Sequence, residues 1–282
     1  GLEQVLAALR DMEFSGQTLD YLRSVPAFSK VGDPAARDRF FEWLRAFRFD
    51  CEVRAVPEGT VFFPNEPVLQ VHGSLLKGQL VETYLLSVLN FQTLVASKAA
   101  RVRLAAPEKK LVDFGTRRAH GPQAGLMAAR AAYVAGFDGT SNVLAGQTLG
   151  MPIVGTAAHA YTMAFSSEVD AFRHYSQTYP DYTVLLIDTY DTLRGANRAA
   201  DVGSILKGVR LDSGDLGALA KEVRKILDER GLQAASIVAS SDLNEYKVRD
   251  LLKDGAPIDT FGIGTELVTS RDDPTLAGVY KL

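Results

Sequence analysis

The sequence predicts an α/β fold: an irregular TIM-like α/β barrel that follows an N-terminal α+β domain. From residue 110 onward, short runs of apolar and β-branched residues alternate with segments of helical periodicity, which is typical of a parallel sheet with right-handed crossovers. About eight such runs are present, and eight parallel strands are the number that closes a TIM-like barrel. An open, doubly wound sheet is the alternative.

The N-terminal part of the chain has a different character. Apolar stripes in residues 1–50 predict helices, and short β-branched runs broken by Pro and Gly in residues 51–73 predict a small sheet. Residues 79–103 return to helical periodicity. We therefore expect an N-terminal α+β domain over residues 1–108 and an α/β barrel domain over residues 109–282, which we expect to be truncated at its carboxyl end.

Strands of the second domain are predicted from short apolar runs. They are residues 111–114, 136–139, 152–156, 184–188, 208–212, 236–240, 260–263 and 278–281. The clearest helices between them are residues 216–227 and 244–252. Nearly every predicted strand ends in small, polar or charged residues, and the carboxyl ends of parallel strands meet at one edge. We therefore expect these residues to form one site.

Composition excludes several classes of function. The chain has 282 residues, 46% of them hydrophobic, and a net charge of −3, which allows a sizeable core but gives no basic surface for nucleic acid or a membrane. No segment has the uncharged apolar length of a membrane span. The single cysteine, Cys51, excludes an internal disulfide and a cysteine-based zinc site, and it agrees with the cytoplasmic location that we expect.

Two motifs are candidates for binding an anion. Arg117 and Arg118 follow the first predicted strand of the barrel, and a guanidinium can bind phosphate or carboxylate through two hydrogen bonds. The alternative is a pair of surface arginines bound to nearby acids. Gly262, Gly264 and Thr265 end the strand at 260–263, where glycines can expose backbone N–H groups to an anion, although a simple turn explains the same pattern.

Titratable side chains lie in or soon after two other predicted strands, 208–212 and 152–156. Arg210 and Asp212 alternate with apolar residues, so both can face the barrel interior, where a carboxylate can accept ribose hydroxyls or bind Mg²⁺. Asp215 is either a magnesium ligand or an acidic residue in the first turn of a helix capped by Ser213. His159 is either a reactive group or a histidine hydrogen-bonded within the rim. The sequence has no Ser-His-Asp order, metal-ligand spacing or Walker motif.

Seven segments together resemble the nicotinate phosphoribosyltransferase family. In chain order they are FGTRRAHGPQAGL, GFDGTSNVLAG, MPIVGTAAHA, GVRLDSGDL, ASSDLNE, FGIGTELVTS and GVYKL. Each segment alone is a weak signal, but their joint occurrence in this order is specific. The resemblance implies a type II phosphoribosyltransferase fold, an irregular α/β barrel packed against an N-terminal α+β domain, and a homodimer.

The resemblance also implies a reaction. Nicotinate and 5-phosphoribosyl 1-diphosphate would form nicotinate mononucleotide and pyrophosphate in NAD salvage, with Mg²⁺ on the diphosphate and ATP hydrolysis coupled through a phosphohistidine at His159. By the same resemblance, Arg210 and Thr156 would hold nicotinate, Asp212 the ribose and Arg117 the phosphate groups. The positions that match the cradle of the 5′-phosphate are Asp242, Gly262, Gly264 and Thr265.

Ser141 bears on the choice of base. Relatives that use nicotinamide carry an aspartate at the matching position, where it accepts a hydrogen bond from the amide. A carboxylate there would repel nicotinate, so Ser141 favours the acid. Two other interpretations stay open: a sibling enzyme that uses nicotinamide or quinolinate, and an inactive truncated barrel that acts as a binding module.

Overall fold

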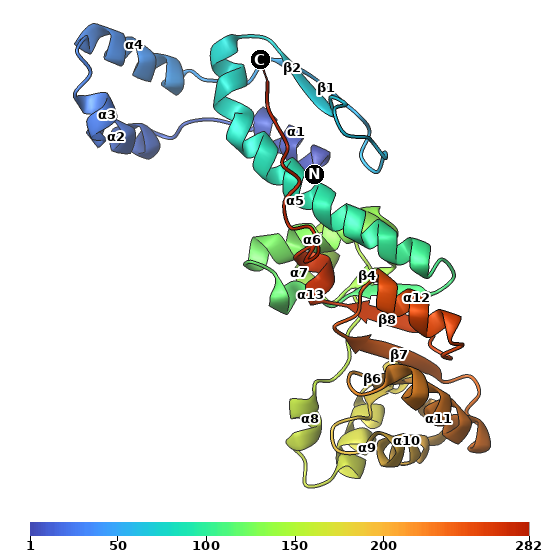
Figure 1. Cartoon of the computed structure of the whole chain (residues 1–282). Coiled ribbons are helices and arrows are strands. Elements are labelled where there is room, and N and C mark those ends of the chain that lie inside the picture. Colours follow the sequence, from blue (N-terminus) through green and yellow to red (C-terminus); the bar gives the residue numbers. More distant parts are fainter. Residues whose placement is uncertain (282) are drawn as a thin grey trace. The chain divides into compact units, whose positions relative to one another are not determined.

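The computed structural model describes residues 1–281 of the chain. These divide into two compact units, Gly1–Asn90 together with the residues from Ala277 onward, and Phe91–Leu276. The long helix α5 (Leu75–Ala105) begins in the first unit and ends in the second (Figure 1). The predicted division of the chain after residue 108 stays a prediction.

The first unit contains the helices and the small sheet that the sequence predicts. Its helices before α5 are α1 (Leu2–Arg10), α2 (Gly16–Ser24), α3 (Pro26–Ser29) and α4 (Pro34–Arg45), and its antiparallel strands are β1 (Glu52–Ala55) and β2 (Leu69–His72). Side chains at i and i+4 form one apolar face on α1 and another on α5, because helical neighbours four residues apart lie on the same side. Val5 and Leu9 thereby pack with Val81 and Leu85 in a buried cluster.

The second unit is built on a six-stranded, wholly parallel sheet. The strands are β3 (Lys110–Asp113), β4 (Gly139–Thr140), β5 (Val184–Leu186), β6 (Gly208–Leu211), β7 (Ser236–Ser241) and β8 (Thr260–Ile263). Their spatial order is β4-β3-β8-β7-β6-β5. The structure confirms the α/β class and six of the predicted strand positions. Successive residues of an inner strand point to opposite faces, and both Ile237 and Val238 of β7 are buried, because the sheet is covered on both sides.

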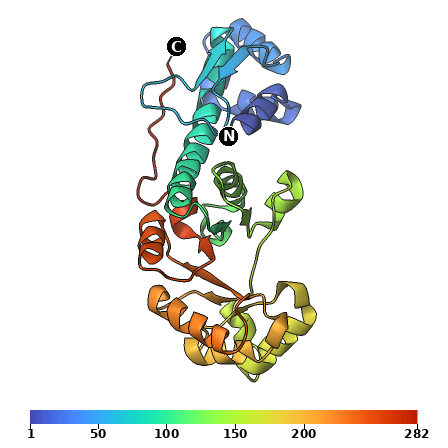
Figure 2. The same ribbon diagram turned by 90° about the vertical axis from the view of Figure 1, so that its right-hand side faces the viewer.

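Helices connect successive strands, and one more, α13, follows the last strand. They are η1 (Thr116–Arg118), α6 (Pro122–Val134), α7 (Val143–Leu149), α8 (His159–Met163), α9 (Glu168–Thr178), η2 (Pro180–Tyr182), α10 (Thr192–Ala200), η3 (Gly203–Ile205), α11 (Leu216–Glu229), α12 (Glu245–Lys253) and α13 (Thr265–Val268). Helices α9, α10 and α11 lie together beside the half of the sheet that contains β5 to β7 (Figures 1 and 2). Side chains of Asp191, Asp215 and Asn244 cap α10, α11 and α12 at the points where the chain leaves the sheet edge.

Two predicted strands are not formed among the described residues. In the segment predicted at 152–156, Ile153 makes a single parallel bridge to Thr140, because Pro152 has no N–H to donate to a ladder. Residues 278–281 form no strand, and the hydroxyl of Tyr280 donates instead to the carbonyl oxygen of Gly78 in the first unit. The sheet is therefore open between its edge strands β4 and β5, and the closed barrel is not confirmed.

The open sheet is nevertheless strongly curled. Thr156, which follows the bridge beside β4, accepts a hydrogen bond of 2.8 Å from Arg210 of β6. In a flat sheet, the four strand spacings between β4 and β6 would separate them by about 19 Å. Curling thus brings the ends of distant strands to a common point. No described helix has both the length and the apolar character to cross a membrane.

Candidate active site

The carboxyl ends of the inner strands lie at one level. Ile263 of β8 pairs with Asp113 of β3 on one side and with Ser241 of β7 on the other, and Leu211 of β6 pairs with Ala239 of β7. The loops that follow these residues therefore leave the sheet at the same edge. This arrangement is the one that parallel α/β folds use to assemble sites from separate loops.

Arg210 is the centre of a polar cluster at this edge. Its Nε donates to Ser240 Oγ at 2.7 Å, Nη1 to Thr156 Oγ1 at 2.8 Å and Nη2 to Asp212 Oδ1 at 2.7 Å. Ser240 in turn donates to the same Asp212 oxygen at 2.6 Å. The side chain of Arg210 is only 11% exposed, so its position is fixed by partners from three separate strands or strand ends.

Asp212 is held in its ionised form. Burial by itself raises the pKa of this carboxyl, but the hydrogen bond from Ser240 and the positive charge of Arg210 outweigh that effect, so the pKa of Asp212 lies below its ordinary value. The backbone N–H of Asp212 donates to Asp188 Oδ2 at 2.8 Å, as does the Ser213 hydroxyl at 2.7 Å. A carboxylate of low pKa can stabilise positive charge on a ligand at neutral pH.

His159 faces these carboxylates. Its Nε2 lies 3.7 Å from Asp212 Oδ2 and 4.0 Å from Asp188 Oδ1, and its Nδ1 lies 3.2 Å from Thr189 Oγ1. The Asp188 side chain is 1% exposed, and among the described residues its Oδ1 accepts no hydrogen bond. An orphaned buried carboxylate oxygen is costly, and here it is aimed toward a half-exposed histidine.

An aromatic ring lies beside the arginine. The Arg210 guanidinium carbon is 5.4 Å from the centre of the Phe114 ring, within the range of a cation–π contact. A Cβ atom at Gly262 would clash with the same ring. Gly262 is thus an internal residue of β8 whose missing side chain makes room for Phe114. The ring is half-buried and gives the cluster one flat apolar wall.

The arginine pair predicted from the sequence extends into solvent. Arg117 and Arg118 lie in η1 directly after β3, both are exposed, and no acidic residue within residues 1–281 pairs with them. Behind them, the buried Asp113 accepts hydrogen bonds from the Gly115 N–H and from Thr140 Oγ1, both at 2.7 Å. Burial raises the pKa of Asp113. This carboxyl ties the loop after β3 to the last residue of β4.

Ser141 follows Thr140 at the same edge. Its backbone N–H donates to the carbonyl oxygen of Asp113 at 2.8 Å, and its side chain is half-buried. The next residue, Asn142, caps α7 and also donates to Thr116 Oγ1 at 3.2 Å. The Asn142 side chain is therefore already hydrogen-bonded within the protein. The Ser141 hydroxyl makes no hydrogen bond to the described residues, so it is available to a ligand.

Asp215 and Asp242 lie outside the Arg210 cluster. Both line a cavity of about 380 Å³ between α11 and α12. Asp215 accepts from the N–H groups of Gly217 and Ala218 as the N-cap of α11. The prediction that Ser213 caps this helix is wrong, because the Ser213 hydroxyl is committed to Asp188. In the described part of the chain, no group of three or more acidic, His or Cys side chains has the geometry of a metal site.

Gly264 and Thr265 form the junction between β8 and α13. Gly264 has φ −114° and ψ −105°, a conformation outside helix and sheet, and Thr265 begins the short helix. Across the edge, Ser241 at the end of β7 has φ +138°, which is rare for a residue with a side chain. Strained backbone of this kind is concentrated at functional sites, and here it immediately precedes Asp242.

Three members of the cluster are not predicted by the sequence pattern. Each is the last residue of a predicted strand: Asp188, Ser240 and Phe114. This position at a strand end is the one feature of the sequence that could have marked them as site residues. A residue at the end of a strand can face either the core or the edge where ligands bind. Only the side-chain direction separates the two cases, and a one-residue change in strand register reverses it.

Comparisons with known proteins identify the family that the chain resembles along its length. The model of the nicotinate phosphoribosyltransferase (NAPRTase) N-terminal domain matches residues 1–90, and that of the NAPRTase family matches residues 109–282. Curated nicotinate phosphoribosyltransferases of Mycobacterium tuberculosis and Bacillus subtilis are 46% and 42% identical over the whole of this chain. The crystal structure of human nicotinic acid phosphoribosyltransferase matches 94% of this chain with a TM-score of 0.83 and 34% identity.

The chain spans only part of these proteins. It covers 60% of the Mycobacterium tuberculosis protein, 57% of the Bacillus subtilis protein and 64% of the human chain. The two family models nevertheless account for most of its residues, and the second alone covers more than half of them. The chain therefore belongs to the nicotinate phosphoribosyltransferase family.

Proposed function

We propose that this chain carries the catalytic site of an ATP-coupled nicotinate phosphoribosyltransferase, which forms nicotinate mononucleotide from nicotinate and 5-phosphoribosyl 1-diphosphate. The observation that supports it most is Arg210, a guanidinium fixed by three partners beside an aromatic ring. A planar, fixed cation next to a flat apolar wall suits an aromatic carboxylate, because the cation binds the carboxylate and the wall packs on the ring.

The spacing of the strands supports binding of the rest of the nucleotide. Arg210 is on β6, and Gly264 and Thr265 follow β8, two strands away. Two strand spacings are about 10 Å, which is comparable to the reach from a pyridine carboxylate across a ribose to its 5′-phosphate. We assign Asp212 to the ribose in this arrangement. The exposed Arg117 and Arg118 are then available to the diphosphate.

The reaction needs charge and position rather than a protein nucleophile at the sugar. The bond from ribose C1 to the diphosphate oxygen breaks, its electron pair leaves with pyrophosphate, and the pyridine nitrogen forms the new bond to C1. Positive charge develops on the ribose in between, and the ionised Asp212 carboxylate would stabilise it. The fixed guanidinium would align the ring nitrogen.

His159 is arranged to accept a phosphoryl group. The carboxylates of Asp188 and Asp212 near Nε2 favour a proton on that nitrogen, which leaves the lone pair on Nδ1. In this tautomer the Thr189 hydroxyl donates to Nδ1. When Thr189 turns away, Nδ1 can bond to the γ-phosphorus of ATP as the bond to ADP breaks. Later hydrolysis of the phosphohistidine would favour product formation.

Mg²⁺ fits this set of donors as a companion of the diphosphate. Asp188 has a buried oxygen without a hydrogen bond among the described residues, and Asp212 has a second carboxylate oxygen nearby. One or two carboxylates together with substrate phosphates are the usual magnesium environment. The bound ion would neutralise charge on the diphosphate. Asp215, which caps α11, fits this role less well.

The assembly and the location belong to the same proposal. We expect a homodimer in the cytoplasm and, with the residues from Ile153 to Thr156 completing the curl toward β5, an irregular barrel. The unpaired Cys51 agrees with a reducing compartment. Sedimentation of the purified protein at micromolar concentration would distinguish a dimer from a monomer.

Turnover with three pyridine bases tests the proposed function. Nicotinate, nicotinamide and quinolinate are each offered with 5-phosphoribosyl 1-diphosphate and Mg²⁺, with and without ATP, and mononucleotide is measured. We expect turnover with nicotinate, stimulated by ATP. Preference for nicotinamide or quinolinate would assign the chain to a sibling activity, and binding without turnover of any base would favour a binding module.

A further inference from the structure

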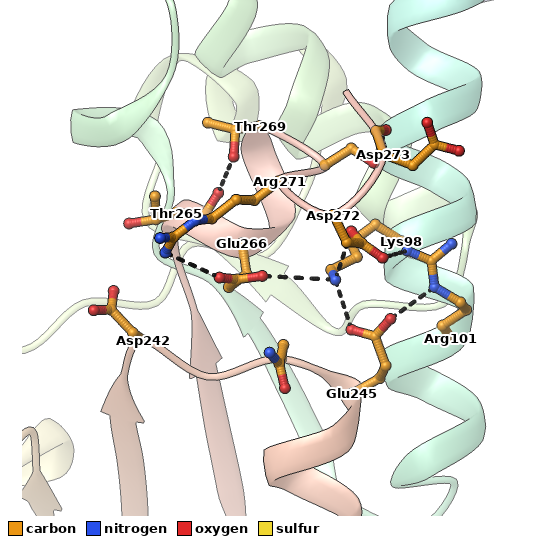
Figure 3. A network of polar contacts seen from close by, with 12 residues as sticks. Lys98, Arg101, Asp242, Glu245, Thr265, Glu266, Thr269, Arg271, Asp272 and Asp273 are labelled. Atoms are coloured by element: carbon orange, nitrogen blue, oxygen red, sulfur yellow. Dashed lines mark hydrogen bonds and ion pairs between the residues drawn. The ribbon is translucent and has the colours of Figure 1, made fainter. Parts of the chain in front are cut away.

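A buried lysine outside the candidate site is surrounded by three carboxylates. The Lys98 side chain, on α5, is 1% exposed. Its Nζ lies 2.7 Å from Glu245 Oε2, 2.8 Å from Asp272 Oδ1 and 3.7 Å from Glu266 Oε2 (Figure 3). The four residues come from α5, α12, α13 and the segment after α13, all within the second unit.

Two arginines complete the network. Arg101 donates to Glu245 and to Asp272, each at 2.7 Å, and Arg271 lies 3.3 Å from Glu266 (Figure 3). Three cations thus face three carboxylates. Burial by itself lowers the pKa of Lys98, but the hydrogen bond from its Nζ to Asp272 and its close contact with the Glu245 carboxylate raise it above its ordinary value. Burial by itself raises the pKa of the Glu245 and Asp272 carboxyls, but their contacts with cations, Lys98 first, outweigh it and lower the pKa below its ordinary value, so these three groups are charged at neutral pH.

The carboxylates of the network adjoin the edge that carries the candidate site. Glu245 opens α12, three residues after Asp242, and Glu266 follows Thr265 directly in α13. Lys98 contacts both, and it therefore ties the loop after β7 to the loop after β8. The Asp242 carbonyl is also held, by Lys247 Nζ at 2.7 Å from the same helix α12.

Stability alone gives a weak reason for this network. The free-energy cost of removing several charges from water is about as large as the favourable free energy of their attraction. Apolar residues of the same volume often stabilise a fold as well as buried ion pairs do, or better. A network of fixed ion pairs does, however, hold its members at defined distances, which apolar contacts do less strictly. These pairs join the start of α12, after β7, to α13, after β8.

We propose that Lys98 is a positioning residue, which fixes the loops of Asp242 and of Gly264–Thr265 at the spacing needed to hold the 5′-phosphate of the substrate. The inference rests on the proposed function for the identity of that substrate. Lys98 itself is buried and acts only through Glu245 and Glu266. Its loss should therefore weaken binding of the phosphoribosyl group and leave recognition of the base unchanged.

The experiment compares Lys98→Met with Arg198→Met. Arg198 pairs at 2.9 Å with the buried Glu168, between α9 and α10, so its loss also strands a buried carboxylate but touches neither loop. Calorimetry measures binding of ribose 5-phosphate, and steady-state kinetics measure the KM for each substrate. We expect Lys98→Met to weaken binding of ribose 5-phosphate, and to raise the KM for the phosphoribosyl donor, by about tenfold or more. The KM for nicotinate and the kcat should stay within about twofold of the wild-type values. Lys98→Arg, which keeps the positive charge, should recover most of the binding of ribose 5-phosphate.

Each outcome decides the inference. Equal phosphate binding in Lys98→Met and Arg198→Met overturns it, as does a wild-type protein that binds no ribose 5-phosphate. If Lys98→Met is unfolded, Glu266→Gln replaces it, since this change removes one charge contact of Lys98 and keeps the shape. A third outcome separates the two proposals. If the wild type binds ribose 5-phosphate, Lys98→Met weakens that binding, and neither protein turns over nicotinate, the positioning role is supported and the proposed function is refuted.

Discussion

The pairing of Arg210 with Asp212 can be tested without any substrate. The two side chains are 2.7 Å apart and only 11% and 22% exposed. Arg210→Met, Asp212→Asn and the double variant form a double-mutant cycle, in which the free energy of unfolding is compared among the four proteins. The cycle isolates the interaction between the two groups from the effect of removing either one.

The geometry sets the expected size of the coupling. Unit charges about 4 Å apart in a partly buried site attract by ~4 kcal/mol at an effective dielectric constant of about 20. The remaining exposure and the hydrogen bond that Ser240 keeps with Asp212 after Arg210 is lost both reduce this figure. We therefore expect a coupling free energy of about 1.5–3 kcal/mol, the range of a hydrogen bond to a charged group.

Urea unfolding followed by circular dichroism at pH 7 measures the coupling. A matched cycle on the exposed pair Arg249 and Asp250, which are 59% and 60% exposed, should give less than about 1 kcal/mol. If the Arg210–Asp212 coupling is no larger than that of the exposed pair, the two groups are not joined in solution, and the fixed guanidinium on which the proposed function depends is absent.

Three further predictions concern individual side chains. His159→Ala should abolish the stimulation of nicotinate turnover by ATP and leave a slower ATP-independent rate, measured as mononucleotide formed per minute; unchanged stimulation would rule out a phosphohistidine at this position. Ser141→Asp should lower kcat/KM for nicotinate by about tenfold or more through repulsion of its carboxylate, while nicotinamide loses less; an equal loss for both bases would contradict the role of Ser141 in base choice. Because the folded pKa of Asp212 is lowered, the stability that it contributes is present above the unfolded value of about 3.9 and is lost as pH falls through the folded pKa. The difference in unfolding free energy between wild type and Asp212→Asn should therefore shrink as pH falls from 7 to 3, and a constant difference would show that Asp212 has no lowered pKa.

The elements of the fold are easier to predict from the sequence than closure of the sheet. Alternating periodicities indicate the α/β class, the helices α11 and α12 and most strand positions, because these depend on local burial patterns. Closure of the sheet into a barrel depends instead on whether its two edge strands form hydrogen bonds with each other. Pro152 limits one edge segment to a single β-bridge, and residues 278–281 lie in the first unit. The hydrophobic periodicity of the sequence reveals neither fact.

The candidate site is predictable only in part, for a similar reason. Arg210, Asp212 and His159 stand out in the sequence, and the family resemblance adds Thr156. The structure brings the four together although Thr156 and Arg210 are 54 residues apart. Their supporting group Asp188 does not stand out, because a strand-terminal carboxylate is indistinguishable in sequence from a turn residue. Its importance depends on the direction of one orphaned oxygen, which only the three-dimensional arrangement supplies.

A crystal structure with bound nicotinate mononucleotide would test the central claim most directly. We predict the pyridine carboxylate on the Arg210 guanidinium, the ring against Phe114, and the 5′-phosphate at Gly264 and Thr265. A nucleotide bound in the opposite orientation, or at any place other than the carboxyl edge of β6 to β8, would contradict the proposed site.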